Sequence, residues 1–222
     1  MAGLYDLHVH TLLSDGEMLP IELVRRAAVL GYTTIAIADH ADNSNLCEVI
    51  AAVRKVEDSA EDFGVRLLCG VELTHVPPAK IPLLAGKATA EGADIVVVHG
   101  ETVIEPVAPG TNHAACGCDE VHVLAHPGLI DPSDAELAAA TGVALEVTSR
   151  GGHNRTNGHV VLCARDAGCT IVINSDAHAP HDLLNDQERW MVARGAGMTE
   201  KEAKKSLSLN IHRWMSKRGS HS

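Results

Sequence analysis

The feature that most constrains the fold is a regular alternation of two kinds of segment along nearly the whole chain. Seven short runs are apolar and rich in β-branched residues, a composition typical of buried strands. These predicted strands cover residues 4–9, 34–38, 66–71, 94–98, 121–125, 143–147 and 170–174. Helical spacing of apolar residues predicts helices between and after them, over residues 20–31, 46–63, 81–91, 133–141, 157–167, 180–194 and 199–215. Segment 109–118 is short and broken by glycine, and no element is predicted there.

This alternation predicts a parallel sheet with helical crossovers, and therefore an α/β fold. Seven strands of this kind can close into a barrel or form an open, doubly wound sheet. The first strand is not followed by a glycine-rich phosphate loop, which disfavours an open nucleotide-binding sheet. Without any linker or low-complexity segment, we expect one domain over residues 1–216 and a disordered tail over 217–222.

Composition narrows the range of partners. The formal net charge is -11, and the chain contains one Phe, two Tyr and two Trp. A protein that binds nucleic acid without sequence preference needs a basic face and benefits from aromatic rings that stack on bases. We therefore expect nucleic acid not to be a partner, and the core to be packed by aliphatic side chains.

The sequence also bears on the compartment. Its apolar runs are far shorter than a membrane span, so we expect no membrane attachment. We recognise no signal peptide in the sequence, so we expect its six cysteines to be reduced thiols and the protein to be cytoplasmic. The spacing of Cys116 and Cys118 matches no standard zinc pair, and we interpret both as ordinary thiols.

Histidine is unusually frequent, with fourteen residues in 222, and its positions are informative. Histidines and carboxylates gather where the predicted strands end. The carboxyl ends of parallel strands meet on one face of a β/α barrel, so these side chains would converge there. The strand-end groups are His8 and His10, Asp39 and His40, Glu72, His99, His126, Glu146, and Asp176 and His178.

Imidazole and carboxylate together form the ligand set preferred by Zn, Mn and Fe. His8 and His10 lie two residues apart on a strand, so both side chains point to the same side. Asp176 and His178 repeat this spacing at the other end of the chain. A single strand-end histidine is more often structural, but this many ligand types at consecutive strand ends predicts a metal site.

Six motifs in this order resemble the PHP (polymerase and histidinol phosphatase) superfamily, and they span nearly the whole chain. They are Asp6-Leu7-His8-Val9-His10 with Asp15-Gly16, Ala38-Asp39-His40, Gly70-Val71-Glu72, His99-Gly100-Glu101, Ala125-His126-Pro127-Gly128 and Ser175-Asp176-Ala177-His178. Within the superfamily, the chain is most similar to small stand-alone members labelled histidinol-phosphatase-like. That similarity rests on residues 72–78, 107–112 and 156–159.

The resemblance implies a distorted seven-stranded (β/α)7 barrel that holds three divalent metal ions, either Zn, Mn or Fe, at the carboxyl ends of its strands. Some relatives carry His at the position of Asp15, and a carboxylate is a competent hard ligand there. The implied ligands are His8, His10, Glu72 and Asp176 for the first metal, Glu72, His99 and His126 for the second, and Asp15, His40 and His178 for the third.

These features predict a phosphatase that hydrolyses a small phosphomonoester through a metal-bridging hydroxide, with Glu72 and Asp176 as catalytic metal ligands. The polar loop 149–157 follows the sixth strand and suits phosphate recognition. Arg150 is the first candidate for binding the phosphate, since a guanidinium fork matches phosphate oxygens, and Arg155 is the second. His153 is the candidate proton donor.

Three other classes of function remain open at this stage. Related domains act on nucleic-acid ends, so the chain could be a nuclease or phosphodiesterase. Similar metal barrels also hydrolyse C–N or C–O bonds. A non-catalytic module is disfavoured because all nine ligand positions carry competent ligands.

Overall fold

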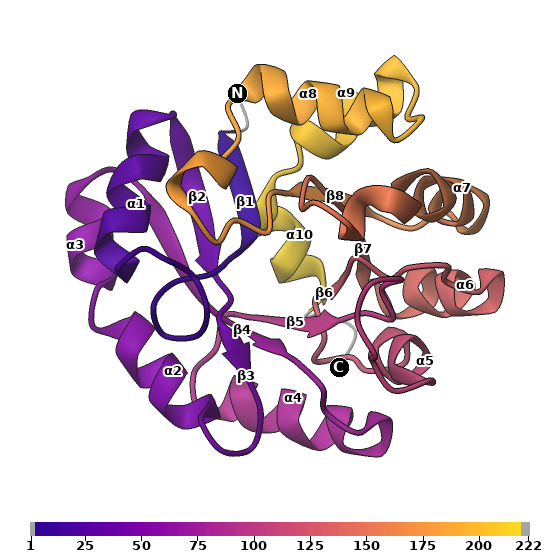
Figure 1. The fold of residues 1–222 in the computed structure, drawn as a ribbon, viewed down its shortest axis with the longest axis horizontal. Helices are drawn as coiled ribbons and strands as arrows, with labels where there is room; N and C mark the ends of the chain where they lie inside the picture. Colours follow the sequence, from indigo (N-terminus) through magenta and orange to yellow (C-terminus); the bar gives the residue numbers. More distant parts are fainter. Residues whose placement is uncertain (1–2, 219–222) are drawn as a thin grey trace.

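A computed structural model describes residues 3–218, and its centre is a nearly closed barrel of seven parallel strands (Figure 1). Neighbouring strands follow the order β1-β2-β4-β5-β6-β7-β8, and each pair is parallel. The predicted barrel is therefore confirmed. A short eighth strand, β3 (His40–Ala41), pairs with the end of β4. The barrel strands are β1 (Leu4–Val9), β2 (Tyr32–Ile37), β4 (Arg66–Leu73), β5 (Ile95–His99), β6 (Val123–Ala125), β7 (Ala144–Thr148) and β8 (Ile171–Asn174).

Side-chain and backbone hydrogen bonds together complete the seam between β1 and β8, where the backbone ladder is incomplete. The Leu7 amide donates to Asn174 Oδ1 at 3.0 Å, and the Asp176 amide donates to the His8 carbonyl at 3.0 Å. The fully buried Arg189 of α8 (Asp186–Gly195) lies against this seam and donates to the Ile173 carbonyl. These contacts bring the first and last strands together, and with them the first and last predicted ligands.

Helices surround the strands, as Figure 1 shows. Within the described residues, no helix combines the length and the apolar character needed to cross a membrane. The remaining α-helices are α1 (Pro20–Val29), α2 (Leu46–Arg54), α3 (Glu57–Asp62), α4 (Ile81–Ala90), α5 (Thr111–Cys116), α6 (Pro132–Thr141), α7 (Asn157–Ala167), α9 (Glu200–Leu207) and α10 (Ile211–Arg218), with 3₁₀ turns at Pro78–Lys80, His153–Thr156 and Pro180–Asp182.

Three predicted helices differ from the structure: two are divided into shorter helices, and one starts later than predicted. Segment 46–63 divides into α2 and α3, although its apolar positions are compatible with one continuous helix. Segment 180–194 begins with a 3₁₀ turn, and α8 starts only after Asn185, whose side chain accepts from the Glu188 amide. Segment 199–215 divides into α9 and α10, where the Asn210 side chain accepts from the Arg213 amide.

Segment 109–118 and the carboxyl-terminal end of the chain also differ from the prediction. α5 forms within segment 109–118, where the sequence predicted no element. α10 continues to Arg218, two residues into the segment expected to be a disordered tail, and residues 219–222 lie outside the described residues.

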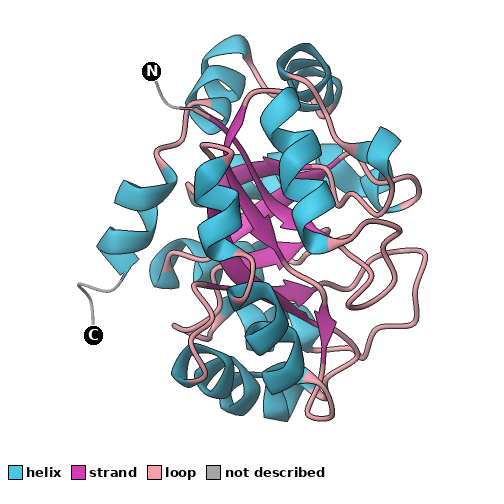
Figure 2. Ribbon diagram, turned by 90° about the vertical axis from the view of Figure 1, so that its left-hand side faces the viewer, coloured by secondary structure: helices cyan, strands magenta, loops and turns pink. Residues whose placement is uncertain are grey.

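Apolar side chains fill both the outside and the inside of the barrel. One large cluster packs the helices against the outer faces of the strands. A second cluster fills the interior and includes Ile211 and Trp214 of α10, which pack with residues near the strand starts such as Ile95, Val123 and Ala144. α10 therefore closes the amino-terminal end of the barrel. In Figure 2 it lies on the left, and the long loops gather on the right.

Candidate metal centre

The nine predicted metal ligands lie together at the carboxyl end of the barrel, opposite α10. His8 is in β1, His40 in β3, Glu72 in β4 and His99 in β5, and the other ligands lie in the loops that follow strands. Six of the nine are buried, His40 and His178 are partly exposed, and Asp15 is exposed. The buried ligands are His8, His10, Glu72, His99, His126 and Asp176.

Glu72 and Asp176 occupy the middle of the group and face imidazoles on several sides. Glu72 Oε1 lies 3.3 Å from His8 Nε2, and Glu72 Oε2 lies 3.7 Å from His10 Nε2. Asp176 Oδ1 lies 3.3 Å from His10 Nε2, and Asp176 Oδ2 lies 3.6 Å from His126 Nε2. The four side chains predicted for the first metal therefore lie together, and His126, predicted for the second metal, lies beside them.

A second cluster lies towards the open rim beside β1. Asp15 Oδ2 lies 3.2 Å from His178 Nε2 and 3.5 Å from His40 Nε2. These are the three residues predicted for the third metal. His10 joins them, because the donor atoms of all four side chains lie within 4.8 Å of one another.

A third cluster combines His99 and His126 with a residue that the sequence assigned differently. The donor atoms of His99, His126 and His153 lie within 4.8 Å of one another. Glu72, predicted to share the second metal, reaches this cluster through a 3.6 Å approach of its Oε1 to His126 Nε2. Glu105, which the sequence did not single out, also faces it, with Oε2 3.0 Å from His99 Nε2.

Outer contacts fix the orientation of the imidazole rings. His8 Nδ1 lies 2.8 Å from Glu146 Oε1, so Nδ1 donates to that carboxylate and Nε2 faces the cluster. His178 Nδ1 donates to the Asp176 carbonyl at 3.0 Å, and His99 Nδ1 donates to the Gly100 carbonyl at 3.2 Å. Such contacts to the far nitrogen are typical of metal-binding histidines.

The carboxylates in the middle have opposite electrostatic environments. Burial alone would raise the pKa of Glu72, but the imidazoles of His8 and His99 hold it well below its usual range. Burial raises the pKa of the Asp176 carboxyl to about 8, with His8 opposing this effect and the Glu72 carboxylate adding to it. Two buried carboxylates this close repel each other, and cations are needed to stabilise both in ionised form.

The pKa values of the histidines are also shifted in opposite directions. Burial lowers the pKa of His10 and of His126, and a neighbouring imidazole, His8 or His99, lowers each further. Both rings are therefore neutral at neutral pH, the form that binds a metal ion. Burial also opposes the charged form of His40, yet the Glu72 carboxylate raises its pKa to about 10.

Unsatisfied polar atoms and backbone strain indicate that a metal fits here. His10 Nδ1, His126 Nδ1 and Glu72 Oε1 are buried without a hydrogen-bond partner, a state that is costly unless a ligand completes it. His126 and Asp176 also adopt positive φ angles of 27° and 54°. Strain at non-glycine residues tends to occur where function requires a particular orientation. The donor set, the orphaned atoms and the strain are all consistent with bound divalent metals.

Two strand-end carboxylates have roles other than those of the nine. Asp39 accepts hydrogen bonds from the Thr11 amide, the Thr11 hydroxyl and the Ser14 hydroxyl, so it holds the loop that carries Asp15. Glu146 orients His8 and accepts from the His126 amide at 3.0 Å. The sequence had placed both at strand ends, and only the contacts separate these roles.

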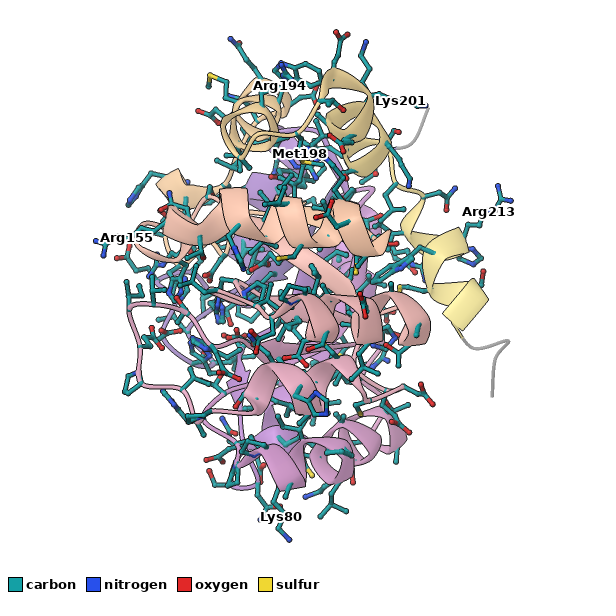
Figure 3. The ribbon with its side chains drawn as sticks, turned by 90° about the vertical axis from the view of Figure 1, so that its right-hand side faces the viewer. Lys80, Arg155, Arg194, Met198, Lys201 and Arg213 are labelled. Atoms are coloured by element: carbon teal, nitrogen blue, oxygen red, sulfur yellow. The ribbon has the colours of Figure 1, made fainter. Side chains whose placement is uncertain are left out.

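The residues predicted to bind phosphate differ in their surroundings. Arg150 Nη1 donates to Asp182 Oδ2 at 3.4 Å, and the same carboxylate accepts from the amides of His178 and Ala179. Arg150 is thus attached to the segment that carries a predicted ligand. In Figure 3, by contrast, Arg155 lies at the edge of the molecule and points away from it.

His153, the predicted proton donor, is buried beside His126, with ring centroids 4.1 Å apart. Burial and the nearby His99 lower its pKa to about 4. A pKa this low favours the neutral ring, and the role of proton donor stays a prediction. The six cysteines are free, and the groups of potential metal ligands found among the described residues contain none of them.

Comparisons with known proteins agree with this geometry. The PHP domain family matches residues 6–189. An uncharacterized protein of Methanocaldococcus jannaschii, MJ1295, is 48% identical over 205 residues, which cover 91% of this chain and 94% of that protein. The crystal structure of histidinol phosphate phosphatase from Lactococcus lactis, complexed with zinc, L-histidinol and phosphate, has a similar fold. Its TM-score is 0.59 at 16% identity, and the match covers 90% of this chain and 93% of that one.

A further relative bears on the partners expected from composition. Ribonuclease P protein component 3 of Methanosarcina mazei is 31% identical over 219 residues, which cover 92% of this chain and 85% of that protein. A protein named for a ribonuclease is thus similar along nearly the whole chain. The expectation that nucleic acid is not a partner is therefore unsupported, because net charge describes the whole surface and not the surroundings of one site.

Proposed function

The chain belongs to the PHP domain family, and from this premise we propose that it is a metal-dependent phosphoesterase that hydrolyses a small phosphomonoester. The observation that carries the proposal is the convergence of nine competent ligands, six of them buried, with three buried polar atoms of the group lacking partners. Five imidazoles lie beside the two central carboxylates. A phosphate ester needs nearby positive charge, and bound metals would supply it here.

We assign the ligands as the motifs imply. His8, His10, Glu72 and Asp176 would hold one metal, Glu72, His99 and His126 a second, and Asp15, His40 and His178 a third. When bound, divalent metals supply Lewis acidity and a hydroxide nucleophile near neutral pH. Within this chain, Glu146 holds His8 in the required tautomer, and Asp39 holds the loop that positions Asp15.

Arg150 is the proposed phosphate-binding side chain. Its guanidinium donates to Asp182, and the side chain is one-third exposed, so further donors remain available at the rim. A phosphate held by cations still has oxygens that face away from them, and a planar guanidinium fork fits those oxygens. His153 lies deeper and stays the candidate proton donor, with its Nε2 3.6 Å from Glu105 Oε1.

A nuclease is the second candidate function. It is favoured by the similarity to ribonuclease P protein component 3, which extends along nearly the whole chain. It is disfavoured by the net charge of -11 and the five aromatic residues, which leave little basic or stacking surface. We rank the phosphomonoesterase first because the ligands form one compact group and the chain has only five aromatic residues that could stack on bases.

A substrate panel distinguishes the two. Phosphomonoesters, phosphodiesters, single-stranded DNA and RNA would be supplied to the protein with Mn, Zn or Fe. We expect phosphomonoesters to be hydrolysed fastest, and Glu72→Gln protein purified in parallel to show no turnover. Faster cleavage of DNA or RNA under matched conditions would reverse the ranking. Turnover by the variant close to that of wild type would contradict the assignment of Glu72 to the metal centre.

A further inference from the structure

The loop between β5 and α5 brings a carboxylate to the metal centre that none of the six motifs contains. Glu105 lies in this loop, and its Oε2 is 3.0 Å from His99 Nε2 while its Oε1 is 3.6 Å from His153 Nε2. Its two oxygens therefore span two of the three imidazoles in the cluster of His99, His126 and His153.

Both ends of this loop are fixed. Glu101 Oε1 accepts from the amides of Gly110 and Asn112, at 3.0 and 2.9 Å, and Asn112 Oδ1 accepts in return from the Glu101 amide. On the barrel side, Gly128 leaves room for the loop, because a Cβ there would lie 1.9 Å from the Glu101 carbonyl oxygen. The path of the chain towards Glu105 is thus set by several independent contacts.

The middle of the loop rests on the segment that carries His153. Thr102 Oγ1 lies 2.9 Å from His153 Nδ1. Ile104 covers Gly152, where a Cβ would come within 2.7 Å of Ile104 Cδ1. Because the hydroxyl fixes Nδ1 of His153, Nε2 of that ring faces the cluster and Glu105.

Glu105 differs from the other carboxylates of the centre in its exposure. Its side chain is 38% exposed, whereas that of Glu72 is fully buried. A buried ligand that bridges imidazoles cannot leave without breaking the barrel interior. A half-exposed carboxylate on a loop can move into solvent, and it occupies a place that an incoming anion would need.

We propose that Glu105 is an exchangeable metal ligand, which completes the coordination of the metal at His99 and His126 in the substrate-free protein and is displaced by the phosphate group of the substrate. This inference rests on the proposed metal centre and adds a residue to it. A carboxylate and a phosphate oxygen are both hard anionic donors, so they compete for one position. The exchange would keep the metal bound between turnovers and make binding of the ester depend on its negative charge.

The test uses Glu105→Gln, with Glu91→Gln as the matched control at the opposite end of the barrel. Glutamine keeps the size of the side chain and removes the anionic donor. Metal affinity would be measured by calorimetric titration with Mn²⁺. The affinity for inorganic phosphate would then be measured at saturating Mn²⁺. Equal melting temperatures of the metal-free proteins would establish that both variants fold.

We expect one of the bound metal equivalents to weaken by about 10- to 100-fold in Glu105→Gln, on the scale seen when groups around a metal are removed. Phosphate should bind roughly three- to tenfold more tightly, because the competing carboxylate no longer occupies part of the population. The Glu91→Gln protein should match wild type in both measurements.

Two results would overturn the inference. If Mn²⁺ affinity were unchanged in Glu105→Gln, Glu105 would be a surface carboxylate next to His99 and nothing more. If Mn²⁺ affinity fell but phosphate bound equally or more weakly, Glu105 would be a permanent ligand that the substrate does not displace. A wild-type protein that takes up no Mn²⁺ would instead refute the proposed metal centre itself, so the two failures are distinguishable.

Discussion

The two ends of the barrel are built from the same strands and have opposite chemistry. At the amino-terminal end, Ile211 and Trp214 of α10 pack on apolar residues such as Ile95 and Val123. At the carboxyl end the same strands finish in imidazoles and carboxylates that are buried without enough partners among themselves. One end contributes stability and the other holds reactive groups that would destabilise a folded protein unless metals compensate them.

The comparison predicts that substitutions at the two ends fail in different ways. At the carboxyl end, Glu72→Gln should lower turnover by more than about 100-fold, beyond the loss typical of groups that only surround a metal. The reason is that Glu72 approaches His8, His10 and His126, and amide oxygen is a poor bridging ligand. The protein should still fold, with a lower melting temperature in metal-containing buffer because less metal binds the native state.

Steady-state kinetics in metal-replete buffer and thermal melts would check this, with Glu136→Gln on the surface of α6 as the control. Near-wild-type turnover of the Glu72→Gln protein would remove Glu72 from the centre and with it the proposed assignment.

A smaller loss is expected one step away from the proposed metal ligands. Arg150→Ala should lower kcat/KM by roughly one to three powers of ten, the scale for losing one charge-assisted contact to the transition state. Metal content should be unchanged, because guanidinium is not a ligand, and inorganic phosphate should inhibit the variant more weakly. Arg155→Ala provides the comparison within the same loop, since Arg155 points away from the molecule (Figure 3). If Arg155→Ala had the larger effect, the phosphate-binding role would pass to Arg155.

A smaller effect is expected for a residue that only orients a metal ligand. Glu146→Gln removes the carboxylate that lies 2.8 Å from His8 Nδ1 and that accepts from the His126 amide. We expect metal affinity to fall by about 10- to 100-fold, because the His8 ring loses its fixed tautomer. Titration with Mn²⁺ would measure this. An affinity equal to that of wild type would mean that packing alone orients His8.

At the amino-terminal end we expect the reverse: a substitution should lower stability and leave activity unchanged. Trp214→Ala should destabilise the protein by about 3 kcal/mol, as is usual when a large buried side chain is truncated, since Trp214 is 9% exposed. Per folded molecule, metal content and kcat/KM should match wild type. Chemical denaturation and kinetics would be compared. A loss of activity without a loss of stability would contradict the separation of the two ends.

The fold was largely predictable because its determining signals are local. Alternation of β-branched runs with helical spacing predicted the parallel strands, and the motifs predicted their closure into a barrel. The ends of helices were less predictable. The start of α8 had a recognisable signal, since Asn185 is followed three residues later by Glu188. The break between α2 and α3 had none, because the apolar positions fit one continuous helix.

The site was predictable where backbone geometry alone brings residues together. Strand ends converge in any barrel of this kind, so His8 and His99 could be placed near one another from sequence. Glu105 could not, because it lies in a loop whose path depends on Glu101, Gly128 and Thr102. For the same reason the sequence could not separate Asp39, which holds a loop, from the carboxylates that face the imidazoles.

The central claim is that the carboxyl end of the barrel is a metal centre, and metal content tests it most directly. Elemental analysis of gently purified protein, combined with an accurate protein concentration, would give the number of metal ions per chain. We predict about three transition-metal ions per chain, since the nine ligands divide into three sets of the kind that bind such ions. Fewer than one ion per chain after attempts at reconstitution with Mn, Zn and Fe would contradict the account.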